Sequence, residues 1–331
     1  MEQKRKVEKI ALPSITKALG SGFNLIAENI HFIVLPILFD LLVWLGPRFR
    51  AYDLLKGNVI SLSQQIDQNA PANLLNQMNS LRDIALSALE QTNIMGAIHF
   101  FPISVPILLG GNTSMAGPID NLQVIELHSV FVLFLLIALL ALTGLLFGCF
   151  YYSAIAKKTS IIAYRLTIHR FFRQLLNSFV AVLLLFISLV ILLIPISCIL
   201  SILLMISSAL AQFLSMIFMI MIAWLIIPLF FTMHGIFLGN GVIESLKMSF
   251  NLARWFSTST SFFIVAIVVI SQGMNLIWTI PQPDSWLLLI GITGHAFITT
   301  SLISASFILY QQYLSWISEN EELITKGIIQ K

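Results

Sequence analysis

Residues 175 to 235 form an almost unbroken apolar run of about 60 residues, too long and too apolar for the core of a soluble domain. A membrane-spanning helix needs about 20 apolar residues, so the run predicts two spans joined by a tight turn near residues 207 to 212. The composition agrees, because 58% of the 331 residues are hydrophobic and only 10% are charged. The sequence therefore predicts an integral membrane protein with several spans.

The same criteria, applied along the whole chain, predict six transmembrane helices. The predicted fold class is all-α, a polytopic integral membrane protein. An even number of spans places both termini on one side of the membrane. The predicted spans cover residues 29–46, 127–152, 175–200, 209–235, 261–281 and 286–312.

The distribution of lysine and arginine predicts which side the termini occupy. Fourteen of these residues lie on the side of the termini, and four, Arg48, Arg50, Lys56 and Arg82, lie on the other side. Cytoplasmic loops carry the excess of positive charge. Both termini are therefore predicted to be cytoplasmic, in the cytoplasmic (inner) membrane of a bacterium.

This orientation divides the chain into five parts. Residues 1–28 are a cytoplasmic amphipathic segment, and residues 29–46 are the first span. Residues 47–126 are an extracytoplasmic insertion, residues 127–315 hold the remaining five spans, and residues 316–331 are a cytoplasmic tail.

An amphipathic helix that continues into a span is predicted over residues 239–270. Apolar side chains recur at helical spacing over residues 242–256, with charged and amide side chains on the opposite face, and no charge follows over residues 261–281. Similar segments occur at residues 10–28 and 160–186. The sequence therefore predicts three amphipathic-helix-plus-hairpin units in a pseudo-threefold arrangement.

The insertion between the first two spans is too long to be a structureless loop. Helical apolar stripes at residues 55–66 and 74–89 predict a helical hairpin outside the membrane. The apolar segment that follows, residues 94–120, is broken by prolines and by paired glycines. This texture predicts an interfacial or re-entrant segment packed on protein.

Asp40 is the one carboxylate within a predicted span. An ionised group near the bilayer centre costs about 2.5–3.5 kcal/mol on insertion scales, so such a residue is a functional candidate. Its position less than two turns from the end of the span favours a different interpretation. In that interpretation, Asp40 reaches the outer headgroup region or pairs with Arg48 or Arg50 of the insertion.

Two histidines follow a small residue by one helical turn: Ala27 precedes His31, and Gly291 precedes His295. A small residue at this spacing lets a flat tetrapyrrole approach the helix while the imidazole binds its metal, a pattern that resembles light-harvesting antenna helices. His295 and His31 are therefore candidate cofactor ligands. The alternative is that His295 hydrogen-bonds to a neighbouring helix and that His31 lies near the cytoplasmic interface.

Basic side chains before the third span predict contact with anionic lipid headgroups, at about 1 kcal/mol per charge. Ordinary anchoring of a cytoplasmic loop by positive charge explains them equally well. No catalytic, nucleotide-binding or metal-binding motif is present, so no catalytic residue and no metal ligand is predicted. The candidate headgroup-binding residues are Lys157, Lys158, Arg165, Arg170 and Arg173.

The segment from Gly241 to Phe263, which begins GVIESLKMSFNLARWF, resembles a pattern in poorly characterised bacterial six-helix membrane proteins. These include the membrane domain attached to some glycerophosphodiester phosphodiesterases, and a fainter echo occurs at residues 14–30. The resemblance implies a six-helix membrane fold. It implies no activity, because no phosphodiesterase domain accompanies the segment, and the insertion at residues 47–126 departs from the compact pattern of that family.

Three functions fit these observations. The first is a non-enzymatic accessory or scaffold subunit of a membrane complex, which uses the insertion and the amphipathic helices to hold partner proteins or lipids. The second is a transporter for a small or lipid-like solute, which needs broken helices and polar side chains such as Gln272, Asn275 and His295 near the membrane centre. The third is a tetrapyrrole-binding subunit of a photosynthetic or respiratory complex. No feature predicts a nucleic-acid partner.

Overall fold

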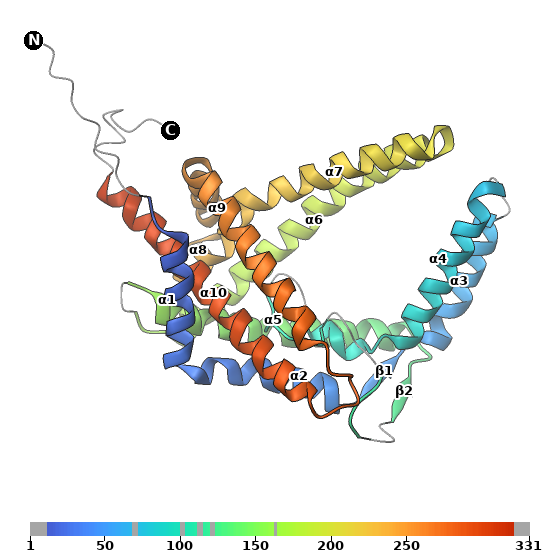
Figure 1. The fold of residues 1–331 in the computed structure, drawn as a ribbon, viewed down its shortest axis with the longest axis horizontal. Helices are drawn as coiled ribbons and strands as arrows, with labels where there is room; N and C mark the ends of the chain where they lie inside the picture. Colours follow the sequence, from blue (N-terminus) through green and yellow to red (C-terminus); the bar gives the residue numbers. More distant parts are fainter. Residues whose placement is uncertain are drawn as a thin grey trace, which may run out of the picture. The chain divides into compact units, whose positions relative to one another are not determined.

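The computed structural model describes residues 12–67, 72–99, 103–110, 115–119, 123–161 and 164–320. Regular structure in this part of the chain is almost entirely helical (Figure 1). The α-helices are α1 (Ile15–Glu28), α2 (Val34–Leu45), α3 (Tyr52–Asp67), α4 (Ala72–Gln91), α5 (Val130–Thr159), α6 (Ile168–Ile206), α7 (Ser208–Leu229), α8 (Thr232–Leu238), α9 (Val242–Trp278) and α10 (Leu288–Glu319). The 3-10 helices are η1 (Ile30–Ile33) and η2 (Ile94–Ile98), and the strands are β1 (Arg48–Arg50) and β2 (Val124–Glu126).

Five helical segments of the described chain are long and apolar enough to cross a membrane. Four are the single helices α5, α6, α9 and α10, and the fifth is α7 joined with α8. A sixth span results only if α1 is counted together with η1 and α2, from which it is separated by a break at Asn29. α2 alone has 12 residues, a length of about 18 Å, which is shorter than the hydrocarbon core of about 30 Å. The predicted all-α polytopic fold is confirmed, with five or six spans.

The chain divides into two compact units. The first contains Met1–Asn29, Cys149–Ile270 and Ser301–Lys331, and the second contains Ile30–Gly148 and Ser271–Thr300. Three of the long helices, α5, α9 and α10, therefore contribute one part to each unit.

The core of the first unit surrounds the C-terminal part of α10. Tyr310 and Tyr313 are buried there among side chains of α8 and α9, and the ring of Phe256 stacks on that of Tyr313 at 4.1 Å between centroids. α1 joins the same core through Gly22. A Cβ at Gly22 would lie 2.6 Å from the backbone oxygen of Ser301, so α1 and α10 are in backbone contact.

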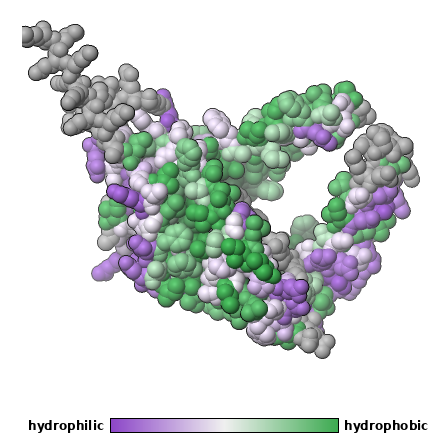
Figure 2. Space-filling model, in the orientation of Figure 1, coloured by the Kyte–Doolittle hydropathy of each residue, from purple (hydrophilic) through white to green (hydrophobic). Residues whose placement is uncertain are grey.

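α6 and α7 of the first unit form a helical hairpin that turns at Ser207, within the predicted turn. The two helices lie side by side in Figure 1, and apolar side chains dominate their surface in Figure 2. None of the most apolar stretch of the α7–α8 span is buried within the protein. In a membrane, such a surface faces acyl chains or other helices.

Two helices of the first unit depart from regular geometry. α7 ends one residue after Pro228, and the chain continues as α8. α9 includes Phe256, whose backbone angles of φ −122° and ψ 27° are not helical. Phe256 stands at the junction between the predicted amphipathic segment and the predicted span, so the predicted continuation of one into the other is confirmed, with a kink. The pseudo-threefold arrangement stays a prediction.

In the second unit, α2 is tied to the turn between α9 and α10. Nε1 of Trp44 donates to the carbonyl oxygen of Pro283 at 2.6 Å, and the Trp44 ring meets that of Trp286 at 5.6 Å between centroids. β1 and β2 pair in parallel, with Phe49 opposite Ile125. From this short ladder extend α3 and α4, which pack on each other and confirm the predicted helical hairpin (Figure 1).

The apolar segment after α4 packs on α5 within the second unit. A Cβ at Gly144 of α5 would lie 2.0 Å from the carbonyl oxygen of Ile98, and a Cβ at Gly148 would lie 2.9 Å from that of Ile103. The two glycines, four residues apart, therefore let the segment approach the backbone of α5. Residues 94–98 and 103–109 are largely buried, so the predicted packing of this segment on protein is confirmed for these residues but not for residues 115–119, which are partly or fully exposed.

Replacing Gly22 by valine is expected to destabilise the protein by about 1–3 kcal/mol, because the new side chain collides with the backbone of α10. Gly20→Ala on the same helix is the matched control. Nothing lies within 4 Å of a Cβ at Gly20, and alanine favours a helix over glycine by about 1 kcal/mol. Thermal unfolding of the purified protein in detergent measures both. A Gly22→Val melting temperature equal to that of the wild type would contradict the backbone contact between α1 and α10.

Candidate functional site

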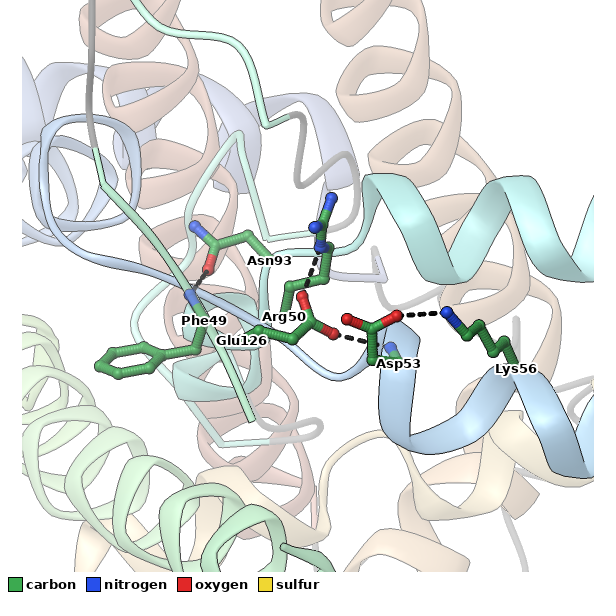
Figure 3. Close-up of polar contacts among 6 residues, drawn as sticks. All are labelled: Phe49, Arg50, Asp53, Lys56, Asn93 and Glu126. Atoms are coloured by element: carbon green, nitrogen blue, oxygen red, sulfur yellow. Dashed lines mark hydrogen bonds and ion pairs between the residues drawn. The ribbon is translucent and has the colours of Figure 1, made fainter. Parts of the chain in front are cut away.

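A polar network joins the first turn of α3 to the two strands (Figure 3). Oε2 of Glu126 on β2 accepts a hydrogen bond from Nε of Arg50 on β1 at 2.7 Å. The other oxygen, Oε1, accepts the backbone N–H of Asp53 at 2.7 Å. Asp53 also pairs with Nζ of Lys56, and this hydrogen bond lowers the pKa of Asp53. One carboxylate, that of Glu126, therefore links the strand pair to the start of the hairpin.

Asn93 secures the other end of the hairpin. Its Oδ1 accepts the backbone N–H of Phe49 at 3.2 Å and that of Met95 at 3.1 Å, and the residue is 1% exposed. The amide thereby caps η2, which follows α4, and binds β1. We refer to Arg50, Asp53, Asn93 and Glu126 as the hairpin root, because they hold both ends of the α3–α4 hairpin.

Beyond the root, the hairpin exposes large apolar side chains. Ile60 and Leu62 of α3 are 39% and 59% exposed, and Leu81 and Ile84 of α4 are 58% and 64% exposed. We call these four residues the hairpin patch. α3 and α4 are not among the helices apolar enough to span a membrane, and they expose many hydrophilic side chains (Figure 2). These apolar side chains are not covered by the rest of the described chain, so they are available for contact with another surface.

The structure corrects the interpretation of Asp40. This residue is 0% exposed, and its two carboxylate oxygens accept the backbone N–H groups of Leu108 at 3.0 Å and Leu109 at 2.9 Å. The expectation that Asp40 reaches the headgroup region is wrong, and so are the expected partners Arg48 and Arg50. Arg48 donates to the carbonyl oxygen of Met115 instead, and Arg50 binds Glu126. The expected contact with the insertion is confirmed, because Leu108 and Leu109 belong to residues 47–126. Asp40 therefore holds the irregular segment that packs on α5.

In the first unit, the imidazole of His234 is buried beside the break between α7 and α8. Nε2 of His234 lies 2.7 Å from Oγ of Ser306 on α10. Oγ of Ser249 on α9 accepts the backbone N–H of Phe231 at 3.1 Å, a group that the interrupted helix leaves free. The His234 ring is enclosed by aromatic rings, of which that of Phe307 is nearest at 4.5 Å between centroids.

Two buried hydroxyl groups converge on Gly235 in the same region. A Cβ at Gly235 would lie 2.7 Å from Oγ of Ser245 and 3.2 Å from the hydroxyl of Tyr310. Neither hydroxyl has a hydrogen-bond partner among the described residues. We call His234, Ser245, Ser306 and Tyr310 the His234 cluster. Within the cluster, His234 and Ser306 share a hydrogen bond, and the hydroxyl groups of Ser245 and Tyr310 remain available as donors or acceptors. Within the described chain, no group of histidine, cysteine or carboxylate side chains could hold a metal ion.

Two of the predicted headgroup-binding residues contact the C-terminal end of α8. Nη2 of Arg170 donates to the carbonyl oxygen of Leu238 at 2.7 Å, while its guanidinium lies 3.7 Å from the centroid of the Tyr164 ring. Arg173 donates to the carbonyl oxygen of Gly239, which has a left-handed φ of 113° and ends α8. Headgroup binding stays a prediction, and four of the five candidates are exposed: Lys157, Lys158, Arg165 and Arg173.

The surroundings of His295 do not fit a tetrapyrrole. Nδ1 of His295 lies 2.8 Å from Oδ1 of Asn275 on α9, the hydrogen bond to a neighbouring helix that was the alternative. A Cβ at Gly291 would lie 2.2 Å from the carbonyl oxygen of Trp278. The backbone of α9 therefore fills the space that a macrocycle would need beside Gly291.

His31 does not follow a small residue by one turn of an α-helix, as tetrapyrrole binding would require. It is exposed and lies on η1, whereas α1 ends at Glu28. Ala27 and His31 are therefore not one turn apart on a single α-helix. The helix surface on which a tetrapyrrole would lie beside the imidazole is not formed.

No protein-family model, no curated protein and no solved structure matches this chain. The resemblance of residues 241–263 to the membrane domain of some glycerophosphodiester phosphodiesterases therefore stays a prediction.

Replacing Glu126 by alanine is expected to loosen the hairpin root, because Arg50 and the backbone N–H of Asp53 both lose their acceptor. Loss of a capping acceptor costs about 1 kcal/mol, so amide hydrogen exchange in the first turn of α3 should accelerate about fivefold. Exchange measured by mass spectrometry tests this, with the exposed Glu90→Ala as control. Unchanged exchange at residues 53–56 in the Glu126→Ala variant would mean that the carboxylate does not hold the hairpin.

Proposed function

We propose that the protein is a non-enzymatic scaffold subunit of a membrane complex, which holds a partner protein on its α3–α4 hairpin. The observation that carries the proposal is the contrast between the hairpin root and the residues farther along the two helices. At the root, both carboxylate oxygens of Glu126 and the Oδ1 of Asn93 accept hydrogen bonds. Along the hairpin, the patch residues Leu81 and Ile84 are more than half exposed.

The energetics of the patch support a partner. Burial of a leucine or isoleucine side chain contributes about 1.5–3 kcal/mol, and the four patch residues leave much of this unrealised in the isolated chain. A partner that covers them gains this energy and meets a hairpin whose ends are already fixed. Such preorganisation reduces the entropy lost on binding.

The proposed setting is the cytoplasmic membrane, with cytoplasmic termini and the hairpin on the opposite side. The excess of lysine and arginine on the side of the termini, fourteen against four, supports this orientation. The partner is therefore a protein with an extracytoplasmic surface, or another membrane subunit that reaches that side.

Replacing Ile84 by aspartate is expected to release the partner, with at least a tenfold loss of the co-purified subunit, because a charge then enters an apolar interface. Ile84→Leu keeps the apolar surface and is the matched control. The full-length protein, tagged and expressed in its native membrane, is extracted in mild detergent, and co-purifying polypeptides are quantified by mass spectrometry. The proposal fails if no polypeptide is stoichiometric in the wild type, or if Ile84→Asp retains it as Ile84→Leu does.

The helix breaks around the His234 cluster favour a second candidate function, passage of a small solute. Interrupted helices beside buried polar groups form the substrate sites of many transporters. Here the α7–α8 break and the non-helical Phe256 both belong to helices that supply the first unit's core. Ser245 and Tyr310 supply unpaired hydroxyl groups there.

Solute passage requires that water reaches the His234 cluster in some state of the protein. A cysteine at Ser245, in a background that lacks Cys149 and Cys198, should then react with a membrane-impermeant maleimide. The control is a cysteine at Ala305, which is equally buried at 0% exposure but apolar. A labelling rate at Ser245 at least tenfold above that at Ala305 is expected, and equal rates would count against transport.

A further inference from the structure

Two grooves flank the first turns of α9 in the first unit. The larger, of about 740 Å³, lies between α6 and α9, and its apolar wall includes Val180, Leu184 and Met248. The smaller, of about 500 Å³, lies on the other side of α9 and is lined by Leu246 and Phe250. The larger volume is in the range of small-molecule sites.

The two grooves share Ile243, Lys247 and Asn251 as lining residues. Lys247 therefore lies between two open apolar hollows of the surface, of which the smaller is lined by α9 alone. This shape fits a molecule with one polar head and two apolar chains, with the head at Lys247 and one chain on each side. A diacyl phospholipid has this form, and these helices lie in a membrane protein where such lipids are abundant.

The charges around Lys247 indicate which headgroup is bound. Lys247 and Glu244 both line the larger groove, both are exposed, and neither takes part in an ion pair with another described residue. Asn177 of α6 lines the same groove. The site thus presents a cation, a carboxylate and an amide within one groove. A headgroup with an anionic group and a hydrogen-bonding cationic group would pair with Lys247 through the first and with Glu244 through the second.

We propose that these grooves bind one phospholipid with a phosphoethanolamine headgroup. The phosphate accepts hydrogen bonds from Lys247, and the primary ammonium donates to the carboxylate of Glu244. A choline headgroup offers no N–H to Glu244, and a glycerol headgroup with a net negative charge is repelled by it. This site is separate from the hairpin patch, and it does not depend on the scaffold function.

The test measures which lipid the full-length protein retains. Purified protein is exchanged into detergent that contains equal amounts of phosphatidylethanolamine, phosphatidylcholine and phosphatidylglycerol with identical acyl chains, and bound lipid is counted by native mass spectrometry. Phosphatidylethanolamine should be retained about fivefold over each of the others, since one headgroup ion pair contributes about 1 kcal/mol. Equal retention of the three lipids would show a non-selective lipid layer and overturn the proposal.

Four variants separate the parts of the site. Lys247→Ala should reduce retention of phosphatidylethanolamine about fivefold, and Glu244→Gln should remove its advantage over phosphatidylcholine. Val180→Trp, which fills the larger groove, should reduce retention of all three lipids. Lys17→Ala, the loss of an exposed positive charge on α1, should change nothing. A fifth variant, Lys158→Ala, tests the exposed basic side chains: a preference for phosphatidylglycerol that Lys158→Ala reduces and Glu244→Gln leaves unchanged would overturn the proposal.

Discussion

Asp40 accepts hydrogen bonds from the backbone N–H groups of Leu108 and Leu109, two donors that no helix or strand satisfies. In a membrane protein, a buried N–H group without an acceptor costs several kcal/mol, so irregular backbone survives only where something replaces the missing helix bond. The single carboxylate of Asp40 replaces the missing helix acceptors of both N–H groups. The burial of the segment on α5, beside Gly144 and Gly148, depends on this pair of bonds.

The same constraint explains several polar side chains inside the first unit. The break between α7 and α8 frees the N–H group of Phe231, which Ser249 binds. The end of α8 frees carbonyl groups, and Gln174 donates to that of Phe237 while Arg170 donates to that of Leu238. The α7–α8 break and the end of α8 are thus both matched by side chains from other helices. At these places a polar side chain marks interrupted backbone.

Long apolar runs made the helical spans, the turn near Ser207 and the α3–α4 hairpin predictable, because periodicity and length are local properties. The hairpin root was not predictable. β1 and β2 have three residues each and are far apart in the sequence, and nothing in the segment VIELH singles out Glu126 as the acceptor for Asp53. A local pattern reveals which face of a helix is apolar, but it does not identify a distant partner.

The histidines show the same limit. A small residue one turn before His295 was compatible both with space for a cofactor and with close helix packing. Only the position of Trp278 on the neighbouring helix decides between them, because its backbone occupies the space beside Gly291. The role of Asp40 was misjudged for a similar reason, since its acceptor function depends on backbone N–H groups 68 and 69 residues later in the chain.

Both helical hairpins expose apolar side chains, many more of them on α6 and α7 than on α3 and α4, and the exposure has a different meaning in each. On α6 and α7, residues such as Ile191 and Phe213 face a medium as apolar as themselves, and lipid satisfies them without any partner. On α3 and α4, Leu81 and Ile84 stand beside charged residues such as Asp83, which acyl chains would not solvate. Lipid therefore solvates the exposed side chains of α6 and α7 completely, but it cannot solvate the charged neighbours of Leu81 and Ile84. The same degree of exposure of a single side chain thus has a different meaning on the two hairpins, because the residues beside it differ.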